Sequence, residues 1–146
     1  PMQIKPADIR FAAMNLWARR EHTYRELHQK LQRRFPDATL VAVEIRRLSD
    51  ENLQSDERFA ENFVLYRASL GFGFIHVRQD MRRRGLSDVQ ITVAFDCAEL
   101  DWVALAKEVY RKKYGEIPPA DIKEKAKRVR YMQYRGFSTD EYQFLF

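Results

Sequence analysis

The sequence predicts an all-α protein of three tandem three-helix repeats, stacked into an elongated, curved molecule. Apolar residues recur at helical spacing nearly everywhere, Ser and Thr capping signals mark several helix starts, and the pattern repeats about every 50 residues. Glycine and proline are scarce, with five of each in 146 residues, which disfavours an all-β protein with many tight turns.

The first repeat, residues 1–54, begins with an amphipathic stretch and continues through a capping box. Thr23 and Glu26 have the spacing at which each side chain satisfies the other's free backbone N–H group. Tyr24, Leu27 and Leu31 then mark one apolar face, and Val41, Ile45 and Leu48 mark another. We expect helices at 7–20, 24–34 and 38–49.

The second repeat, residues 55–100, has the clearest helix starts. Ser55 precedes acidic residues that favour a helix N-terminus, and Ser87 with Gln90 forms a second capping box. Cys97 lies in an apolar run and is expected to be a buried core thiol. The predicted helices are 56–70, 74–84 and 88–98, with apolar stripes at Phe59, Phe63, Tyr66 and Leu70, at Phe74, Val77 and Met81, and at Ile91, Phe95 and Ala98.

The third repeat, residues 101–146, is predicted to hold helices at 101–114, 120–135 and 139–145. Pro118 and Pro119 mark the loop before its second helix, and Ser138 with Glu141 has capping-box spacing. A shift of 51 aligns Arg84-Gly85 with Arg135-Gly136, where each glycine is expected to end a helix in left-handed geometry. A shift of 50 aligns Arg34 with Arg84. Units this small bury their apolar faces better when neighbours stack.

Positive charge gathers on the second helix of each repeat. The chain has 26 Lys and Arg against 21 Asp and Glu, a formal charge of +5, which suits an anionic partner without requiring one. The basic faces are either ordinary solvated surface or a surface that follows an anionic filament or a nucleic-acid backbone. The candidate contact residues are Arg25, Lys30, Arg33, Arg78, Arg82, Arg83, Lys123, Lys125, Lys127, Arg128 and Arg130.

Catalytic and cofactor signals are absent, so we expect no enzyme, metal or cofactor. The three histidines have no metal-ligand spacing, and Gly71-Phe72-Gly73 lacks the Lys-Ser/Thr of a phosphate loop. Asp56, Glu57 and Glu61 are best explained as first-turn acids, although a nuclease with dispersed carboxylates stays as a third alternative. One cysteine excludes an internal disulfide, and no apolar run approaches ~20 residues, so we expect a cytoplasmic monomer without a membrane span.

A helix-turn-helix DNA reader is also considered, because the helices at 74–84 and 88–98 are joined by a short turn containing Gly85. However, the second of these helices, DVQITVAFDCA, has no Lys or Arg to meet bases or phosphates. This disfavours sequence-specific DNA recognition.

The stretch SDERFAENFVLYRASLGFGFIHVRQDMRRRGLSDVQI, residues 55–91, resembles the signature segment of the RecX family of RecA modulators. ARREHTYRELHQKL resembles the family's first repeat, and KEKAKRVRYMQYRGFSTDEY resembles its third. The positions that carry the likeness in the central segment are Asp56, Arg58, Phe59, Ala60, Arg67, Gly71, Gly73, Ile75, Arg84, Gly85 and Leu86.

This resemblance implies a non-catalytic helical repeat protein that binds in the groove of RecA–DNA filaments. It also implies inhibition of RecA ATP hydrolysis, strand exchange and co-protease activity, with DNA contact secondary. The alternative is a stand-alone DNA-binding protein that uses the same basic faces. On a helical wheel Arg84 lies beside the core stripe, and Arg135 is its counterpart, so both are expected to be structural rather than partner-facing.

Overall fold

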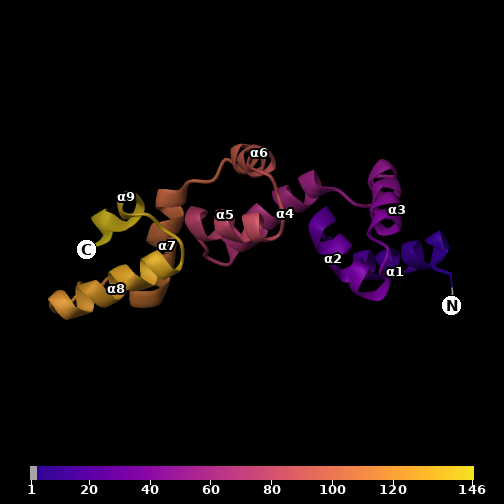
Figure 1. Cartoon of the computed structure of the whole chain (residues 1–146). Coiled ribbons are helices and arrows are strands. Elements are labelled where there is room, and N and C mark those ends of the chain that lie inside the picture. Colours follow the sequence, from indigo (N-terminus) through magenta and orange to yellow (C-terminus); the bar gives the residue numbers. More distant parts are fainter. Residues whose placement is uncertain (1–2) are drawn as a thin grey trace.

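The computed structural model describes residues 3–146, and these residues fold into nine α-helices and one 3₁₀-helix with no strand among them. The predicted all-α fold is confirmed. The helices follow one another along an elongated molecule whose termini lie at opposite ends (Figure 1). None of the described helices is long and apolar enough to cross a membrane.

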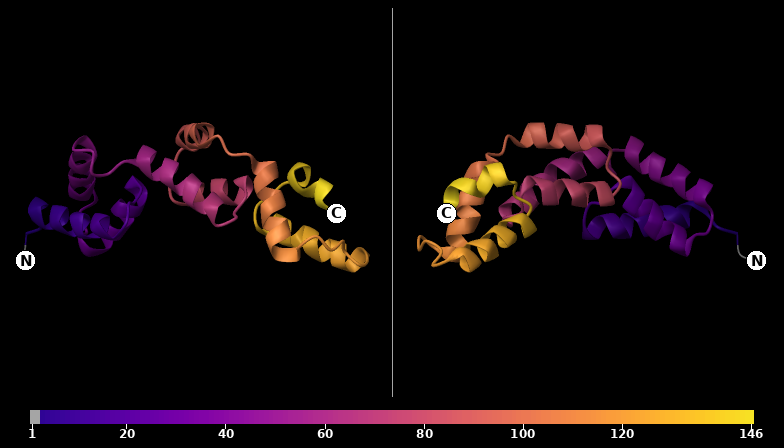
Figure 2. Two further views of the ribbon diagram at one scale, coloured as in Figure 1. Left: turned by 180° about the vertical axis from the view of Figure 1, so that it is seen from behind. Right: turned by 60° about the vertical axis from the view of Figure 1, so that its left-hand side comes forward.

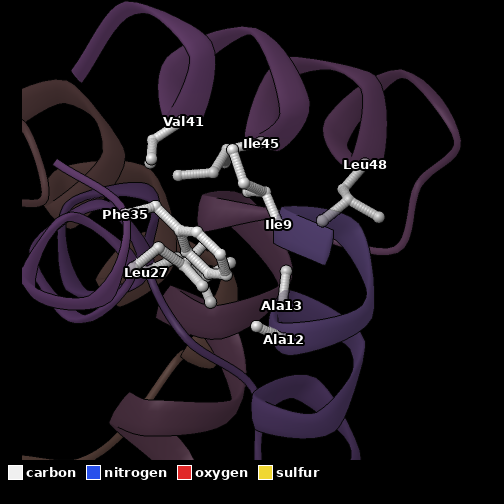
Figure 3. Packing of buried hydrophobic residues seen from close by; sticks show 9 residues of the cluster. Ile9, Ala12, Ala13, Leu27, Phe35, Val41, Ile45 and Leu48 are labelled. Carbon is white, nitrogen blue, oxygen red and sulfur yellow. The ribbon is translucent and has the colours of Figure 1, made fainter. Parts of the chain in front are cut away.

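The first three helices enclose a small apolar core. Pro6, which begins α1, needs no backbone N–H there, and the Thr23–Glu26 capping box starts α2 with both of its hydrogen bonds at 3.1 Å. Side chains from all three helices converge on Ile9 and Ile45 (Figure 3). The bounds are α1 Pro6–Arg19, α2 Tyr24–Arg34 and α3 Ala38–Asp50.

The middle three helices build a second core around Val64, Val77 and Met81, which are fully buried. The Ser87 hydroxyl accepts from Gln90 N at 3.1 Å and Ser87 N donates to Gln90 Oε1 at 2.8 Å, which confirms the predicted capping box. The bounds are α4 Asp56–Ser69, α5 Phe74–Arg83 and α6 Asp88–Ala98.

The last helices form a third core around Ala106, Met132 and Phe137. A single continuous helix at 139–145 is not formed, because α9 ends at Tyr142 and a 3₁₀ turn follows. The bounds are α7 Trp102–Tyr114, α8 Ile122–Tyr134, α9 Thr139–Tyr142 and η1 Gln143–Leu145.

Four residues expected in the core lie outside it: Tyr24, Tyr66, Leu70 and Cys97. Tyr66 is 62% exposed and Leu70 is 46% exposed, because the buried face of α4 turns toward Val64 and Ala68 in its second half. Cys97 is exposed because α6 packs through Ile91 and Ala94, and residue 97 lies well to one side of that face. The expectation of a buried thiol is therefore wrong.

The helices of the three repeats are arranged alike. The second helices α2, α5 and α8 lie along one side and the third helices α3, α6 and α9 along the other (Figures 1 and 2). The middle helices are raised relative to both ends, so the molecule arches. Each buried apolar cluster draws on the helices of one repeat. Between the second and third repeats, the Trp102 ring also packs against the rings of Phe74 and Phe95, with centroids 5.9 and 5.7 Å away.

Candidate functional site

Exposed cations occur on each of the second helices, at positions predicted to meet a partner. They lie on α2, α5 and α8, which share one side of the arch (Figure 1). Because the described part of the chain repeats this arrangement along its length, the cations form a discontinuous basic surface. The exposed members are Arg25, Lys30, Arg33, Arg78, Arg82, Arg83, Lys123, Lys125, Lys127 and Arg130.

A row of unopposed positive charge lies on α8. Lys123, Lys127 and Arg130 recur at i, i+4 and i+7, and Tyr134 extends the row with 76% of its surface exposed. Within residues 3–146 no carboxylate lies within 4.0 Å of these three cations. Their charge is therefore available to an anionic partner.

Arg128 is a correction to the predicted surface, because it is only 6% exposed. Its guanidinium donates to Tyr110 Oη at 2.8 Å and to the Ile117 carbonyl at 2.7 Å, and it pairs with Glu124 at 3.2 Å. It also stands 4.7 Å from the centre of the Tyr114 ring. Arg128 thus holds α8 to α7 and the intervening loop, and it does not face a partner.

The arginines of α5 are more constrained than those of α8. Arg82 pairs with Asp88 at 3.2 Å and stays about half exposed, and Arg83 lies 3.6 Å from Asp80 and stays mostly exposed. The Arg78 guanidinium lies 5.9 Å from the centre of the Phe74 ring. Ion pairs at the surface contribute little free energy, so a binding partner can replace them at small cost.

On α2, Lys30 is tied to a buried histidine. Lys30 Nζ lies 2.9 Å from His22 Nε2, and His22 Nδ1 lies 3.0 Å from the Arg20 carbonyl oxygen. Burial, together with the charges of Arg20 and Lys30, lowers the pKa of His22 from its ordinary 6.5. Burial also lowers the pKa of Lys30, with the charge of Arg20 adding to the effect.

Arg84 and Gly85 join the first and second repeats. Arg84 Nη1 pairs with Glu26 at 2.9 Å, and the Arg84 carbonyl accepts from the Thr23 hydroxyl at 2.6 Å. Burial opposes ionisation of Glu26, but hydrogen bonds from Arg20 and Thr23 and the charge of Arg84 hold its pKa below the ordinary value. Gly85 has φ +92°, and a Cβ there would lie 2.6 Å from Arg25 Cβ.

Asp56 and Arg58 strengthen the same joint from the start of α4. Asp56 Oδ1 accepts from Tyr24 N at 2.8 Å and from Gln54 Nε2 at 2.9 Å. Arg58 pairs with Glu21 and donates to the carbonyls of Asn52 and Leu53 at 3.0 and 3.1 Å. The carboxylate of Asp56 is therefore used in hydrogen bonding, and within the described chain no group of His, Cys, Asp and Glu is arranged to hold a metal ion.

Two backbone hydrogen bonds cross the joint between the second and third repeats. Gly73 N donates to the Arg135 carbonyl at 2.7 Å, and Ile75 N donates to the Gly136 carbonyl at 3.1 Å. A Cβ on Gly73 would meet Gly136 O at 2.6 Å, so the close approach requires glycine. The Arg135 side chain also crosses the joint. It donates to the Gly71 carbonyl at 3.1 Å, and its guanidinium lies 4.2 Å from the centre of the Phe72 ring.

Comparison with known proteins agrees with this architecture. Models of the second and third three-helix domains of RecX match residues 55–94 and 99–143. Regulatory protein RecX of Halorhodospira halophila is 41% identical over 133 residues, which cover 91% of this chain and 83% of the relative. Regulatory protein RecX of Pseudomonas fluorescens Pf-5 is 38% identical over 132 residues, covering 90% and 85%.

The chain belongs to the RecX family. A crystal structure of RecX from Lactobacillus salivarius superposes with a TM-score of 0.79 at 18% identity, covering 96% of this chain and 93% of that one. Another crystal structure of regulatory protein RecX gives the same TM-score at 19% identity, with 96% and 70% covered. The family is one of regulatory proteins rather than enzymes.

Several of the RecX signature residues in this chain lie at the joints. Asp56, Arg58, Arg84 and Gly85 lie where the second repeat meets the first, and Gly71 and Gly73 where it meets the third. Nothing in the sequence taken residue by residue reveals this grouping, because the partners are up to 65 positions apart.

Proposed function

We propose that this protein binds the RecA–DNA filament and restrains RecA ATP hydrolysis, strand exchange and co-protease activity, with direct DNA contact secondary. The observation that carries the proposal is membership of the RecX family over nearly the whole chain. The arched rod with exposed cations on α2, α5 and α8 is a suitable shape and charge for a long anionic groove. We further propose that the units are residues 1–54, 55–100 and 101–146, of which residues 1 and 2 lie outside the described part. We also propose that the protein acts as a cytoplasmic monomer.

The physical basis is multivalency along an elongated molecule. Each repeat contributes modest contacts, and once one repeat is bound the next binds at high effective concentration. A rod that bridges several subunits favours the one subunit geometry that fits it. Hydrolysis that needs a different geometry then becomes slower, because the rod must first release at least one subunit.

The first test reverses the charge of the α8 row. The triple variant Lys123→Glu, Lys127→Glu, Arg130→Glu is expected to bind filaments at least about tenfold more weakly and with a smaller salt dependence. A matched control reverses three exposed cations outside the second helices: Arg46, Lys107 and Arg111. The control makes the same change in net charge and therefore separates the effect of position from that of overall charge. Unchanged filament binding by the α8 variant, or an equal loss of affinity in both variants, contradicts the proposal.

The runner-up is a stand-alone DNA-binding protein, which the unopposed charge on α8 also favours. The same variants measured on bare DNA distinguish the two functions. Tight binding to bare DNA at ~150 mM salt, without inhibition of RecA, supports the runner-up.

A further inference from the structure

Each joint between repeats also forms a groove, and the two grooves are built from equivalent residues. The first joint groove, of about 430 Å³, lies between the first and second repeats, and the second joint groove, of about 360 Å³, lies between the second and third. From α4 the first takes Phe59, Asn62, Phe63, Tyr66 and Arg67. From α7 the second takes Leu105, Glu108, Val109, Lys112 and Lys113. Every residue of the second set is 46 positions after its counterpart, the same offset that separates the helix caps Ser55 and Asp101.

The other walls of the grooves correspond as well. Arg84, which follows α5, closes the first groove, and Arg135, which follows α8, closes the second. The first repeat contributes Arg20 and Glu21 to the first groove. The second repeat contributes Leu70 and Gly71, which lie 50 positions later, to the second groove. The correspondence therefore extends to all three contributing elements.

The two grooves share an apolar floor beneath a cationic rim. Phe63 in the first groove and Val109 in the second are buried floor residues. The guanidinium groups of Arg67 and Arg84 each stand 4.9 Å from the centre of the Phe63 ring. At the mouth, the equivalent positions 66 and 112 hold an exposed tyrosine and an exposed lysine.

Both rims have more positive than negative charge. Three arginines but only one carboxylate line the first groove: Arg20, Arg67, Arg84 and Glu21. Around the second, Lys112, Lys113 and Arg135 have no carboxylate within 4.0 Å in the part of the chain that the structure describes. Each groove is thus complementary to a segment that carries both an apolar side chain and a carboxylate.

We infer that the two joint grooves are a tandem pair of docking sites for one kind of acidic peptide segment with an apolar anchor. Two successive identical subunits of a filament each present one such segment. This inference rests on the proposed function, because a polymer of identical subunits is the partner that offers the same segment twice at a regular spacing.

Nucleic acid fits the grooves less well than an acidic peptide. Stacking of bases requires exposed aromatic faces, but Phe59 and Phe63 are nearly buried. Tyr66 is exposed, but its equivalent in the second groove is Lys112. Tyr131 lines the second groove, but the position 51 residues before it is Asp80, so no aromatic platform is repeated. What is repeated is the apolar floor with cations above it.

The test uses variants at the two mouths with matched controls one residue away. Tyr66→Glu and Lys112→Glu put a negative charge at each groove, and both side chains are exposed, so the fold is expected to tolerate them. Leu65→Glu and Arg111→Glu are also exposed, also 46 positions apart, and line neither groove. Binding is measured to RecA filaments on single-stranded DNA and, separately, to bare single-stranded DNA.

Each groove variant is expected to weaken filament binding about tenfold and the double variant about a hundredfold, because the grooves act independently. The double control is expected to stay within about twofold of wild type, and bare-DNA affinity to change equally in groove and control variants. Wild-type-like binding by the groove double variant, or loss at only one groove, overturns the inference while the proposed function stands. If the groove variants lose more affinity for bare DNA than for filaments, the occupant of the grooves is nucleic acid, and the inference is also overturned. If the wild type fails to bind filaments, the proposed function fails, and this inference with it.

Discussion

Arg84→Ala is predicted to destabilise the protein far more than Arg83→Ala, although the two arginines are neighbours in the sequence. Arg84 pairs with Glu26 at 2.9 Å, lies 3.6 Å from Asp80 and stands over Phe63. Arg83 makes one ion-pair contact, to Asp80 at 3.6 Å, and its side chain is 67% exposed against 25% for Arg84.

The magnitude follows from these contacts. A partly buried, charge-assisted hydrogen bond contributes about 1 kcal/mol after allowance for solvent screening. The guanidinium over an aromatic ring adds about 0.5–1 kcal/mol. The predicted loss for Arg84→Ala is therefore about 2 kcal/mol, or about 4–8 °C in Tm for a chain of this length, and for Arg83→Ala about 0.5 kcal/mol or less.

The assay is thermal or urea unfolding followed at each end of the rod. Trp17 lies in the first repeat and Trp102 in the third, so single-tryptophan variants report the two ends separately. In the Arg84→Ala background the transition seen by Trp17 is expected to separate from that seen by Trp102, because the first joint is weakened. If Arg84→Ala costs no more than Arg83→Ala, the structural role assigned to Arg84 is refuted.

Three further predictions concern the second joint, α8 and the buried histidine. Gly136→Ala is expected to lower Tm through its φ of +97° and a Cβ only 2.6 Å from His76 N, by several degrees more than Gly115→Ala, whose Cβ meets nothing within 4 Å. Arg128→Ala is expected to cost about 3 kcal/mol in urea unfolding because it leaves the Tyr110–Ile117–Glu124 contacts unmade, whereas Lys127→Ala costs under about 0.5 kcal/mol but weakens filament binding. Because the folded-state pKa of His22 is below 6.5, the neutral imidazole contributes fully to stability above that pH, and this contribution is lost as the pH falls. The fall in Tm on acidification is therefore expected to be smaller in His22→Gln than in the wild type. An equal dependence of Tm on pH in the two proteins contradicts this.

The boundaries of the helices could be predicted from local chemistry. Capping boxes at Thr23 and Ser87 act over three residues, so their hydrogen bonds depend little on the rest of the fold. Glycines after the second helices were predicted in left-handed geometry, and Gly85 and Gly136 adopt φ of +92° and +97°.

The burial of Arg128 could have been predicted from its position in the sequence, but it was assigned to the basic surface because of its charge. Arg128 precedes the core residue Met132 by four positions, so it lies on the same face of α8. A charged residue at such a position is either exposed at the edge of the core or fully paired. The loop carbonyl of Ile117 and the hydroxyl of Tyr110, which complete its pairing, are brought there only by the fold.

The exposure of Tyr66 had no such signal. It lies at the edge of the apolar face that includes Phe59 and Phe63, and periodicity cannot tell that burial continues through the small side chain of Ala68 instead. The joint grooves were equally hidden, since they combine residues from three elements of two repeats. Only the repeat offset, applied after the helices are placed, reveals that they correspond.

The most direct measurement is RecA's single-stranded-DNA-dependent ATPase with this protein at sub-stoichiometric concentration, alongside its affinity for bare DNA at ~150 mM salt. We predict strong inhibition at well under one molecule per RecA subunit, together with weak binding to bare DNA. An uninhibited ATPase, or inhibition that only follows saturation of the DNA itself, would contradict it.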